Sequence, residues 1–180
     1  MIVTREELLR ELTAFEQSSE SGFLLLADSG CGKTSALCDY ATHRIEQGKP
    51  TLFFVGNTIE GNLLATLTNE FNWTFSEQVT PVALVKRLSA LTKGIPMVIV
   101  LDALDEWAYP QKAQSLLGFL RGGRNDGVKI VFSCKSGAWE AISQPNGSDL
   151  GFSSYLYKTK TVDESSDAVV LSPMSSPELF

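Results

Sequence analysis

The chain has 180 residues, of which 43% are hydrophobic and 20% charged, and its formal net charge is −6. This composition predicts one soluble globular domain that buries a full core. The acidic balance and the lack of a Lys/Arg cluster argue against nucleic acid as a partner, because a phosphate backbone requires concentrated positive charge. No apolar run reaches the length of a membrane span or a signal-peptide core, so we expect a cytoplasmic protein with no membrane partner.

A helix, a strand and a second helix are predicted first along the chain. Thr4 and Glu7 match a capping box at the start of the first helix. An apolar strand over residues 23–26 follows, and the second helix begins at Lys33 and stops at Gly48. One face of each helix is apolar and should be buried, namely Leu8, Leu12 and Phe15 in the first helix and Leu37, Tyr40, Ala41 and Ile45 in the second. Cys38 is expected in the core, and its spacing to Cys31 and Cys134 indicates reduced thiols rather than a metal site.

Strands and helices continue to alternate in the rest of the chain. Strands are predicted over residues 51–55, 97–101, 129–134 and 168–171. Two helices lie between the first two of these strands, the second of them running from an N-cap at Thr80 to Gly94. A further helix is predicted from about residue 110 to residue 120, ending at Gly122 and Gly123, and residues 144–154 and 163–167 are interpreted as polar surface connections. Right-handed crossovers would place the carboxyl ends of all these parallel strands along one rim.

The segment between the first strand and the second helix has the pattern of a phosphate-binding loop, with alanine in place of the usual first glycine. Backbone N–H groups at the start of the following helix would point inward, where the helix macrodipole adds positive potential. Lys33 would supply charge and Thr34 would coordinate Mg²⁺. The residues predicted to hold the nucleotide are Ala27, Asp28, Ser29, Gly30, Cys31, Gly32, Lys33, Thr34 and Ser35.

A second motif follows the strand over residues 97–101. Asp102 comes directly after five apolar residues, and a carboxylate at the end of a buried parallel strand emerges at the rim where ligands bind. Downstream of a phosphate loop, Asp102 is therefore predicted to hold Mg²⁺. Asp105 and Glu106 come next, before Trp107, which we interpret as a packed aromatic residue that shields this loop.

The run from the apolar strand through Asp102, Ala103, Leu104, Asp105 and Glu106 resembles the Walker B motif of STAND-class signalling NTPases, in particular the NACHT group. In that motif a small residue follows the first Asp, and Ala103 fills the position. The resemblance implies that Asp105 and Glu106 orient or activate the attacking water, without choosing between them. A carboxylate suits this role because phosphoryl transfer depends on a positioned water.

Three further segments resemble parts of the same family. Residues 2–9 are similar to a lead-in that packs near the adenine and reaches toward the phosphates, which would assign Val3 and Arg5 there; an exposed first-turn arginine is the alternative. Residues 130–136 are similar to the sensor 1 motif, with Lys135 where the family usually has arginine; a solvated lysine is the alternative. Residues 169–180 resemble the exit toward a helical lid domain, which implies an NTPase core over residues 1–172 and the start of a truncated lid domain over 173–180.

The resemblance as a whole implies a three-layer α/β P-loop NTPase with a parallel five-stranded sheet in the order 5-1-4-3-2. It also implies a slow, Mg²⁺-dependent ATPase that binds ATP and ADP and acts as a switch in immunity, cell death or anti-phage defence. The implied partners are the lid, sensor and effector domains of a longer protein and further copies in a nucleotide-dependent homo-oligomer. Two other interpretations stay open: another P-loop ATPase or small-molecule kinase, and a non-catalytic nucleotide-binding interaction module.

Overall fold

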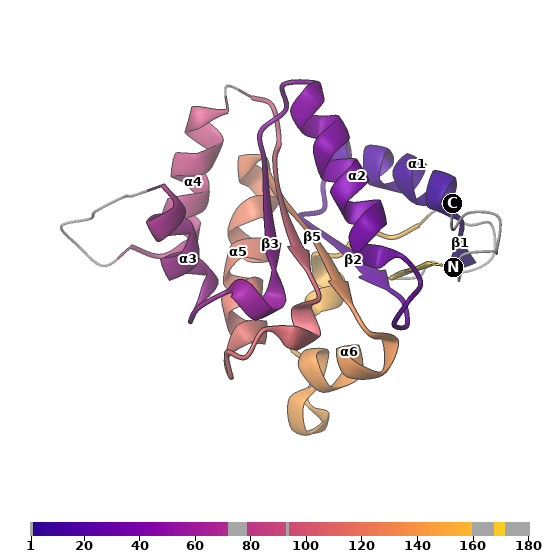
Figure 1. The fold of residues 1–180 in the computed structure, drawn as a ribbon. Helices are drawn as coiled ribbons and strands as arrows, with labels where there is room; N and C mark the ends of the chain where they lie inside the picture. Colours follow the sequence, from indigo (N-terminus) through magenta and orange to yellow (C-terminus); the bar gives the residue numbers. More distant parts are fainter. Residues whose placement is uncertain (1, 72–78, 93, 160–167, 172–180) are drawn as a thin grey trace.

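A parallel six-stranded sheet forms the centre of the fold (Figure 1). The computed structural model describes residues 2–71, 79–92, 94–159 and 168–171. Along the chain the strands are β1 (Ile2–Val3), β2 (Gly22–Leu26), β3 (Thr51–Val55), β4 (Met97–Asp102), β5 (Val128–Cys134) and β6 (Val169–Leu171). Their order in the sheet is β1-β6-β2-β5-β4-β3, which confirms the predicted order of the five longer strands. The two-residue β1, which was not predicted as a strand, pairs with β6 at the edge.

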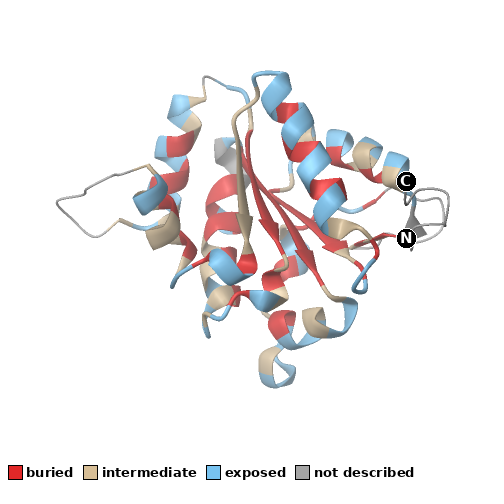
Figure 2. Ribbon diagram, viewed as in Figure 1, coloured by how far each residue is buried: buried red, intermediate tan, exposed pale blue. Residues whose placement is uncertain are grey.

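Helices cover both faces of the sheet (Figure 1). Helices α1 (Arg5–Glu16) and α2 (Lys33–Glu46) pack on one face, and α3 (Leu63–Glu70), α4 (Pro81–Leu91) and α5 (Lys112–Asp126) pack on the other. Helix α6 (Ser136–Ser143) follows β5 at the carboxyl edge. Strand residues alternate between the two apolar cores, so that Val98 faces the α1–α2 side and Ile99 faces the α3–α5 side. The central strands β2, β5 and β4 are thus buried on both faces, while the edge strand β3 is intermediate, as Figure 2 shows.

The predicted helix caps are present. Glu7 N donates to Thr4 Oγ1 at 3.4 Å and Thr4 N donates to Glu7 Oε2 at 2.8 Å, which completes the capping box of α1. Thr80 Oγ1 accepts a hydrogen bond from Ala83 N at 3.2 Å, with Pro81 at the first position of α4. These local signals therefore fixed both helix starts at the predicted residues.

Three predictions about helix faces and ends are wrong. Cys38 is exposed and Ile45 is 59% exposed, because the buried face of α2 continues from Ala41 to Arg44 instead. Helix α5 does not end at Gly122 and Gly123 but runs on to Asp126. A Cβ at Gly123 would lie 2.3 Å from the Val128 carbonyl oxygen, so this glycine permits a close approach of helix and strand.

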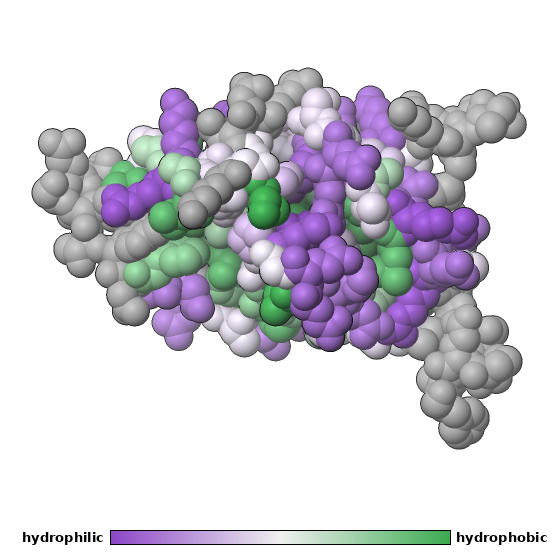
Figure 3. All heavy atoms as spheres, turned by 90° about the horizontal axis from the view of Figure 1, so that it is seen from above, coloured by the Kyte–Doolittle hydropathy of each residue, from purple (hydrophilic) through white to green (hydrophobic). Residues whose placement is uncertain are grey.

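The segment predicted as a polar connection over residues 144–154 contributes to the core. Phe152 is 2% exposed and meets Trp139 edge-on, with ring centroids 5.0 Å apart. Residues 163–167 and the predicted lid-domain start at 173–180 lie outside the described residues. Figure 3 looks onto the edge of the sheet where the strands begin; hydrophilic residues gather on the right of this view, and hydrophobic residues adjoin one another on the left.

Candidate nucleotide-binding site

The loop between β2 and α2 lies at the carboxyl edge of the sheet, as predicted. Gly30 and Gly32 have φ of +83° and +79°, a left-handed conformation that glycine adopts without steric cost, and α2 begins directly afterwards. Lys33 Nζ donates hydrogen bonds to the carbonyl oxygens of Ala27 at 2.7 Å and Asp28 at 2.8 Å. The lysine ammonium and the N-terminus of a 14-residue helix therefore concentrate positive potential at this loop.

The loop residues differ in exposure. Ala27 and Cys31 are buried, while Asp28, Ser29 and Gly30 are exposed at the tip. Ala27 N donates to the Cys134 carbonyl oxygen at 3.3 Å, which ties the base of the loop to the end of β5. The tip is therefore open to a ligand while the base is held by the sheet.

Asp102, the last residue of β4, is held on both carboxylate oxygens. Thr34 Oγ1 donates to Asp102 Oδ2 at 2.6 Å, and Ser133 Oγ donates to Asp102 Oδ1 at 2.5 Å. Ser133 also accepts a hydrogen bond from Ala103 N at 2.8 Å. The Asp102 side chain is 1% exposed, so water does not hydrate its carboxylate. The hydrogen bonds from the two hydroxyl groups replace that hydration.

Ser133 is a site residue that the sequence analysis did not single out. It lies in the segment that resembles sensor 1, in which Lys135 alone was predicted as a site residue. Strand β5 lies between β2 and β4, so the end of β5 is placed between the phosphate loop and Asp102. The sequence places Ser133 in that segment but gives no signal for its contacts, because its partners Asp102 and Ala103 are 31 and 30 positions away.

Asp105, Glu106 and Lys135 come together beside Asp102. Lys135 Nζ lies 3.0 Å from Asp105 Oδ2 and 3.7 Å from Glu106 Oε1, and Lys135 N donates to Asp105 Oδ1 at 3.2 Å. Burial acts to raise the pKa of the Asp105 carboxyl, but the Lys135 hydrogen bonds outweigh it and hold that pKa below its ordinary value. The hydrogen bond and charge of Asp105 raise the pKa of Lys135. Lys135 is therefore paired although its side chain is 44% exposed, and its sensor role stays a prediction.

The two acidic side chains are not equivalent. The Asp105 side chain is 10% exposed and bound to Lys135 through both oxygens, whereas the Glu106 side chain is 44% exposed. Both belong to a short 3-10 turn, Leu104–Glu106, that follows Ala103 in a left-handed conformation (φ 55°, ψ 57°). The left-handed conformation is costly for any residue with a Cβ, Ala103 included, so glycine would adopt it without strain and a β-branched residue would be the least suitable there.

Arg5 contacts the helix that follows the loop, whereas Val3 belongs to the edge strand of the sheet. Arg5 Nη2 donates to Ser35 Oγ at 2.9 Å and pairs with Asp39, both on α2. Val3 is paired with Leu171 of β6 in the register of the sheet. Arg5 therefore reaches the first turns of the helix that begins at the phosphate loop, and its predicted role toward a nucleotide stays a prediction.

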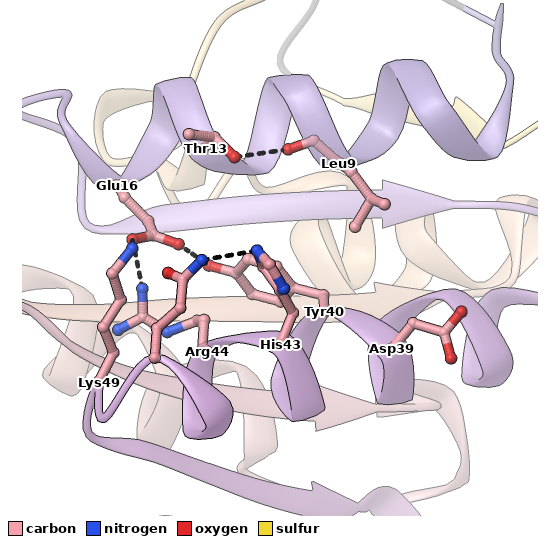
Figure 4. Close-up of a pocket in the computed structure, with 9 residues that line it drawn as sticks. Leu9, Thr13, Glu16, Asp39, Tyr40, His43, Arg44 and Lys49 are labelled. Atoms are coloured by element: carbon pink, nitrogen blue, oxygen red, sulfur yellow. Dashed lines mark hydrogen bonds and ion pairs between the residues drawn. The ribbon is translucent and has the colours of Figure 1, made fainter.

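A groove of about 410 Å³ between α1 and α2 is separate from this site (Figure 4). It follows the second half of α2, toward the edge where the strands begin. At one end the buried Arg44 pairs with Glu16, which also accepts a hydrogen bond from Tyr40 Oη at 3.0 Å and lies 3.4 Å from Lys49 Nζ. Arg44 additionally donates to the Pro96 carbonyl oxygen at 2.8 Å, so this cluster joins α1 and α2 to the start of β4.

Candidate metal ligands at the site are few. Within the part of the chain that the structure describes, no group of three or more His, Cys, Asp and Glu side chains is arranged to hold a metal ion. Thr34 and Asp102 provide one hydroxyl and one carboxylate, which are oxygen donors of the kind that Mg²⁺ binds. Mg²⁺ characteristically takes only one or two protein ligands beside phosphates and water, so the residues present fit this ion.

Among the described helices, none is both long and apolar enough to cross a bilayer.

Comparison with known proteins shows the fold of the chain. No family model and no curated protein matches the sequence. Solved structures do match: ORC1 of Aeropyrum pernix in complex with DNA has a TM-score of 0.61 and 22% identity over 97% of this chain and 47% of that one. Cdc6p from Pyrobaculum aerophilum has a TM-score of 0.56 and 17% identity over 78% of this chain and 40% of that one. Drosophila ORC bound to DNA has a TM-score of 0.55 and 13% identity over 79% of this chain and 82% of that one.

These matches, the sheet order and the phosphate loop together show a P-loop NTPase fold. At 22% identity and below, the likeness extends to the fold alone. The chain spans less than half the length of the matched ORC1 and Cdc6p chains. The DNA belongs to the ORC1 and ORC complexes, and the expectation that this chain does not bind nucleic acid stays a prediction.

Proposed function

We propose that this chain is the ATP-binding switch domain of a STAND/NACHT-type signalling NTPase and that it hydrolyses ATP slowly with Mg²⁺. One observation carries the proposal: the hydrogen bond from Thr34 to Asp102 joins the phosphate loop to the strand end that leads into Asp105 and Glu106. A P-loop fold alone supports many functions, but this junction brings a phosphate cradle, a metal-binding pair and an acidic pair to one edge.

The phosphates of ATP or ADP would be bound by the loop from Ala27 to Ser35. Lys33 Nζ now donates to two loop carbonyls, and it would donate to phosphate oxygens instead when nucleotide is bound. Thr34 and Asp102 would hold Mg²⁺, which when bound neutralises charge on the phosphates. Ser133 keeps the Asp102 carboxylate oriented through its hydrogen bond to Oδ1.

The unequal environments of the two acids support different roles. Asp105 holds Lys135 at the rim, where a lysine ammonium can meet a terminal phosphate. Glu106 is the more exposed of the two and lies farther from Lys135, so its carboxylate is the better candidate to accept a proton from an attacking water. The difference in exposure and pairing supports Glu106 over Asp105 for this role, a choice that the sequence resemblance left open.

Switching, location and assembly are part of the same proposal and are supported by the resemblance alone. In a cytoplasmic switch, ADP would hold a closed state and ATP would permit homo-oligomerisation together with lid, sensor and effector domains. Such a switch requires that ATP bind the two states with different affinity. Preference for ATP over GTP is proposed on the same basis.

A non-catalytic nucleotide-binding interaction module is the second candidate function. The ion pairs of Lys135 favour it, because an ammonium already neutralised by Asp105 and Glu106 is less available to a terminal phosphate. Turnover separates the two candidates: a switch that hydrolyses ATP releases phosphate, whereas a pure interaction module binds nucleotide without releasing it.

The experiment is equilibrium binding of Mg-ATP and of ADP by calorimetry, with the parent chain, Lys33→Ala and a matched control. Lys86→Ala provides the control because Lys86 is an exposed lysine on α4, on the other face of the sheet. We expect the parent and Lys86→Ala to bind both nucleotides and Lys33→Ala to bind neither measurably. A parent chain that binds neither nucleotide, while its circular dichroism shows a folded domain, would contradict the proposal.

A further inference from the structure

Lys112, the first residue of α5, contacts the backbone of the turn that carries the acidic pair. Its Nζ donates hydrogen bonds to the carbonyl oxygen of Trp107 at 2.8 Å and to that of Asp105 at 3.2 Å. A charged donor makes stronger hydrogen bonds than a neutral one. One partly buried ammonium therefore holds the peptide that follows Asp105 and the peptide that follows Trp107.

Helix stability does not explain a lysine at this position. The first turn of a helix is the positive end of its macrodipole, and a cation is favoured at the opposite end. Lys112 is the first residue of a 15-residue helix, so its charge is unfavourable there unless another group compensates. The two carbonyl oxygens of the turn provide that compensation.

The same turn is held on its other side by the region after β3. Trp107 is 1% exposed, and its Nε1 donates to the Gly61 carbonyl oxygen at 2.9 Å. Gly56 lies so close that a Cβ there would be 2.1 Å from the Ala103 carbonyl oxygen. The backbone from residue 103 to residue 107 is thus fixed by contacts from α5 and from the β3 side.

The held backbone determines where the acidic side chains lie. Within the turn, Glu106 N donates to Ala103 O at 2.9 Å and Trp107 N donates to Leu104 O at 3.3 Å. Asp105 then meets Lys135 on the β5 side, whereas Lys112 contacts only the carbonyl oxygens of Asp105 and Trp107 and neither acidic side chain. The direct contacts of Lys112 are therefore with the backbone that carries the acids.

We propose that Lys112 is a positioning residue for Asp105 and Glu106: its ammonium fixes the 103–107 turn so that both carboxylates are held beside Asp102. This inference rests on the proposed function, in which these acids serve ATP hydrolysis. It assigns a role to a residue outside the Walker motifs, and it predicts that catalysis depends on Lys112 while nucleotide binding does not.

The kinetic test compares Lys112→Met, Lys112→Arg and the control Lys86→Met. Methionine keeps the length of the side chain without the charged donor, and arginine restores a charged donor. In Lys112→Met we expect kcat for Mg-ATP to fall about tenfold or more, with KM and the calorimetric Kd changed by less than about twofold. Lys112→Arg should recover most of the lost kcat, and Lys86→Met should match the parent.

A second readout does not depend on hydrolysis. Hydrogen exchange of a peptide spanning residues 103–107 should become about tenfold faster in Lys112→Met, with the amides of β4 unchanged. A parent chain without measurable hydrolysis would contradict the proposed ATPase, and the exchange result would still decide the role of Lys112. An unchanged exchange rate in the turn, or equal acceleration across β4 and α5, would overturn the inference, since the first shows no positioning and the second only general destabilisation.

Discussion

The hydroxyl of Thr34 donates a 2.6 Å hydrogen bond to the carboxylate of Asp102, two residues that are 68 positions apart in the chain. The contact exists because β2 and β4 are separated in the sheet by β5 alone, so that the loop after β2 can reach across to the end of β4. Ser133, at the end of β5, binds the other oxygen of the same carboxylate. Three neighbouring strands thus converge on one buried carboxylate.

Replacing Asp102 by Asn should weaken the metal-dependent part of nucleotide binding. The amide keeps the shape of the side chain but removes the charge that would attract Mg²⁺. We expect Asp102→Asn to bind Mg-ATP about tenfold more weakly than the parent while its affinity for ADP in EDTA is unchanged. Calorimetry with and without Mg²⁺ measures both quantities. Glu140→Gln, an exposed acid on α6, is the control, and equal Mg²⁺ dependence in Asp102→Asn and the parent would refute the assignment.

Glu106→Gln and Asp105→Asn should have different effects because the two acids have different surroundings. If Glu106 accepts the proton of the attacking water, Glu106→Gln lowers kcat by about a hundredfold or more and leaves unfolding by urea unchanged. Asp105→Asn removes the partner of Lys135, so it should reduce both turnover and stability. Phosphate release and urea titration of each variant make the comparison. A larger loss of kcat in Asp105→Asn than in Glu106→Gln would reverse the proposed roles.

The double variant Asp105→Ala/Glu106→Ala separates an ATPase from an interaction module. Within the described part of the chain, neither side chain forms a hydrogen bond or ion pair with the phosphate loop, so nucleotide affinity should be kept. A catalytic role predicts that phosphate release disappears in this variant. A parent chain that binds ATP but releases no phosphate, with the double variant identical to it, would support the non-catalytic module instead.

The sequence predicted the parallel sheet and its order because those depend on local patterns and on a motif. Apolar runs give the strands, and the resemblance to P-loop NTPases of the STAND class implied the strand order that the structure has. The contacts of Ser133 and Lys112 were not predictable in the same way. Ser133 contacts residues that are distant in the chain, and Lys112 contacts backbone carbonyl oxygens, which every residue has. Neither kind of contact leaves a spacing in the sequence that a pattern could detect.

Helix α2 shows where hydrophobic patterning gave the wrong face. Ile45 continues the apolar spacing from Ala41, and the pattern therefore placed it inside. The structure buries Arg44 instead, because the Pro96 carbonyl oxygen and Glu16 are available to its guanidinium. A charged residue can occupy the core when its partners are supplied by other elements, and those partners appear only once the fold is known.

The buried Lys129 should make the free energy of unfolding increase as the pH becomes alkaline. This lysine is 6% exposed, and its Nζ donates to the carbonyl oxygens of Ser18 at 2.9 Å and Glu20 at 2.7 Å. Burial lowers the pKa of Lys129 to about 8 from 10.5. Between these values the unfolded chain keeps the proton that the folded chain has released, so the unfolded state binds more protons and the free energy of unfolding increases with pH.

Urea unfolding at pH 7.5 and pH 9.5 measures this effect, with Lys129→Met as the comparison. The parent should gain stability relative to Lys129→Met across this range, up to a limit of about 3 kcal/mol set by the shift from 10.5 to about 8. Taking the difference between the two proteins removes the pH effects that do not involve Lys129. A parallel pH dependence in both proteins would show that Lys129 has the same pKa in the folded and unfolded states.

The ion pair between Arg44 and Glu16 should stabilise the fold without affecting the nucleotide site. Arg44 is 1% exposed, and its guanidinium also donates to Thr51 Oγ1 at 3.0 Å and to the Pro96 carbonyl oxygen at 2.8 Å. Removing Arg44 leaves the Glu16 carboxylate with Tyr40 and Lys49 as its remaining partners, so Arg44→Met should cost about 3 kcal/mol of the free energy of unfolding. Adding Glu16→Gln to Arg44→Met should recover part of that loss, because the carboxylate that has lost its arginine partner is then also removed.

The position of this pair makes the test specific. Arg44 lies near the end of α2 and the phosphate loop lies at its start, so the pair and the proposed site occupy opposite ends of one helix. Urea titration of the single and double variants gives the interaction energy between Arg44 and Glu16. Calorimetry with Mg-ATP gives the nucleotide affinity of each variant. We expect stability to change and the Kd to remain within about twofold of the parent. A fall in affinity that follows the loss of stability would mean that α2 transmits changes from the groove to the phosphate loop.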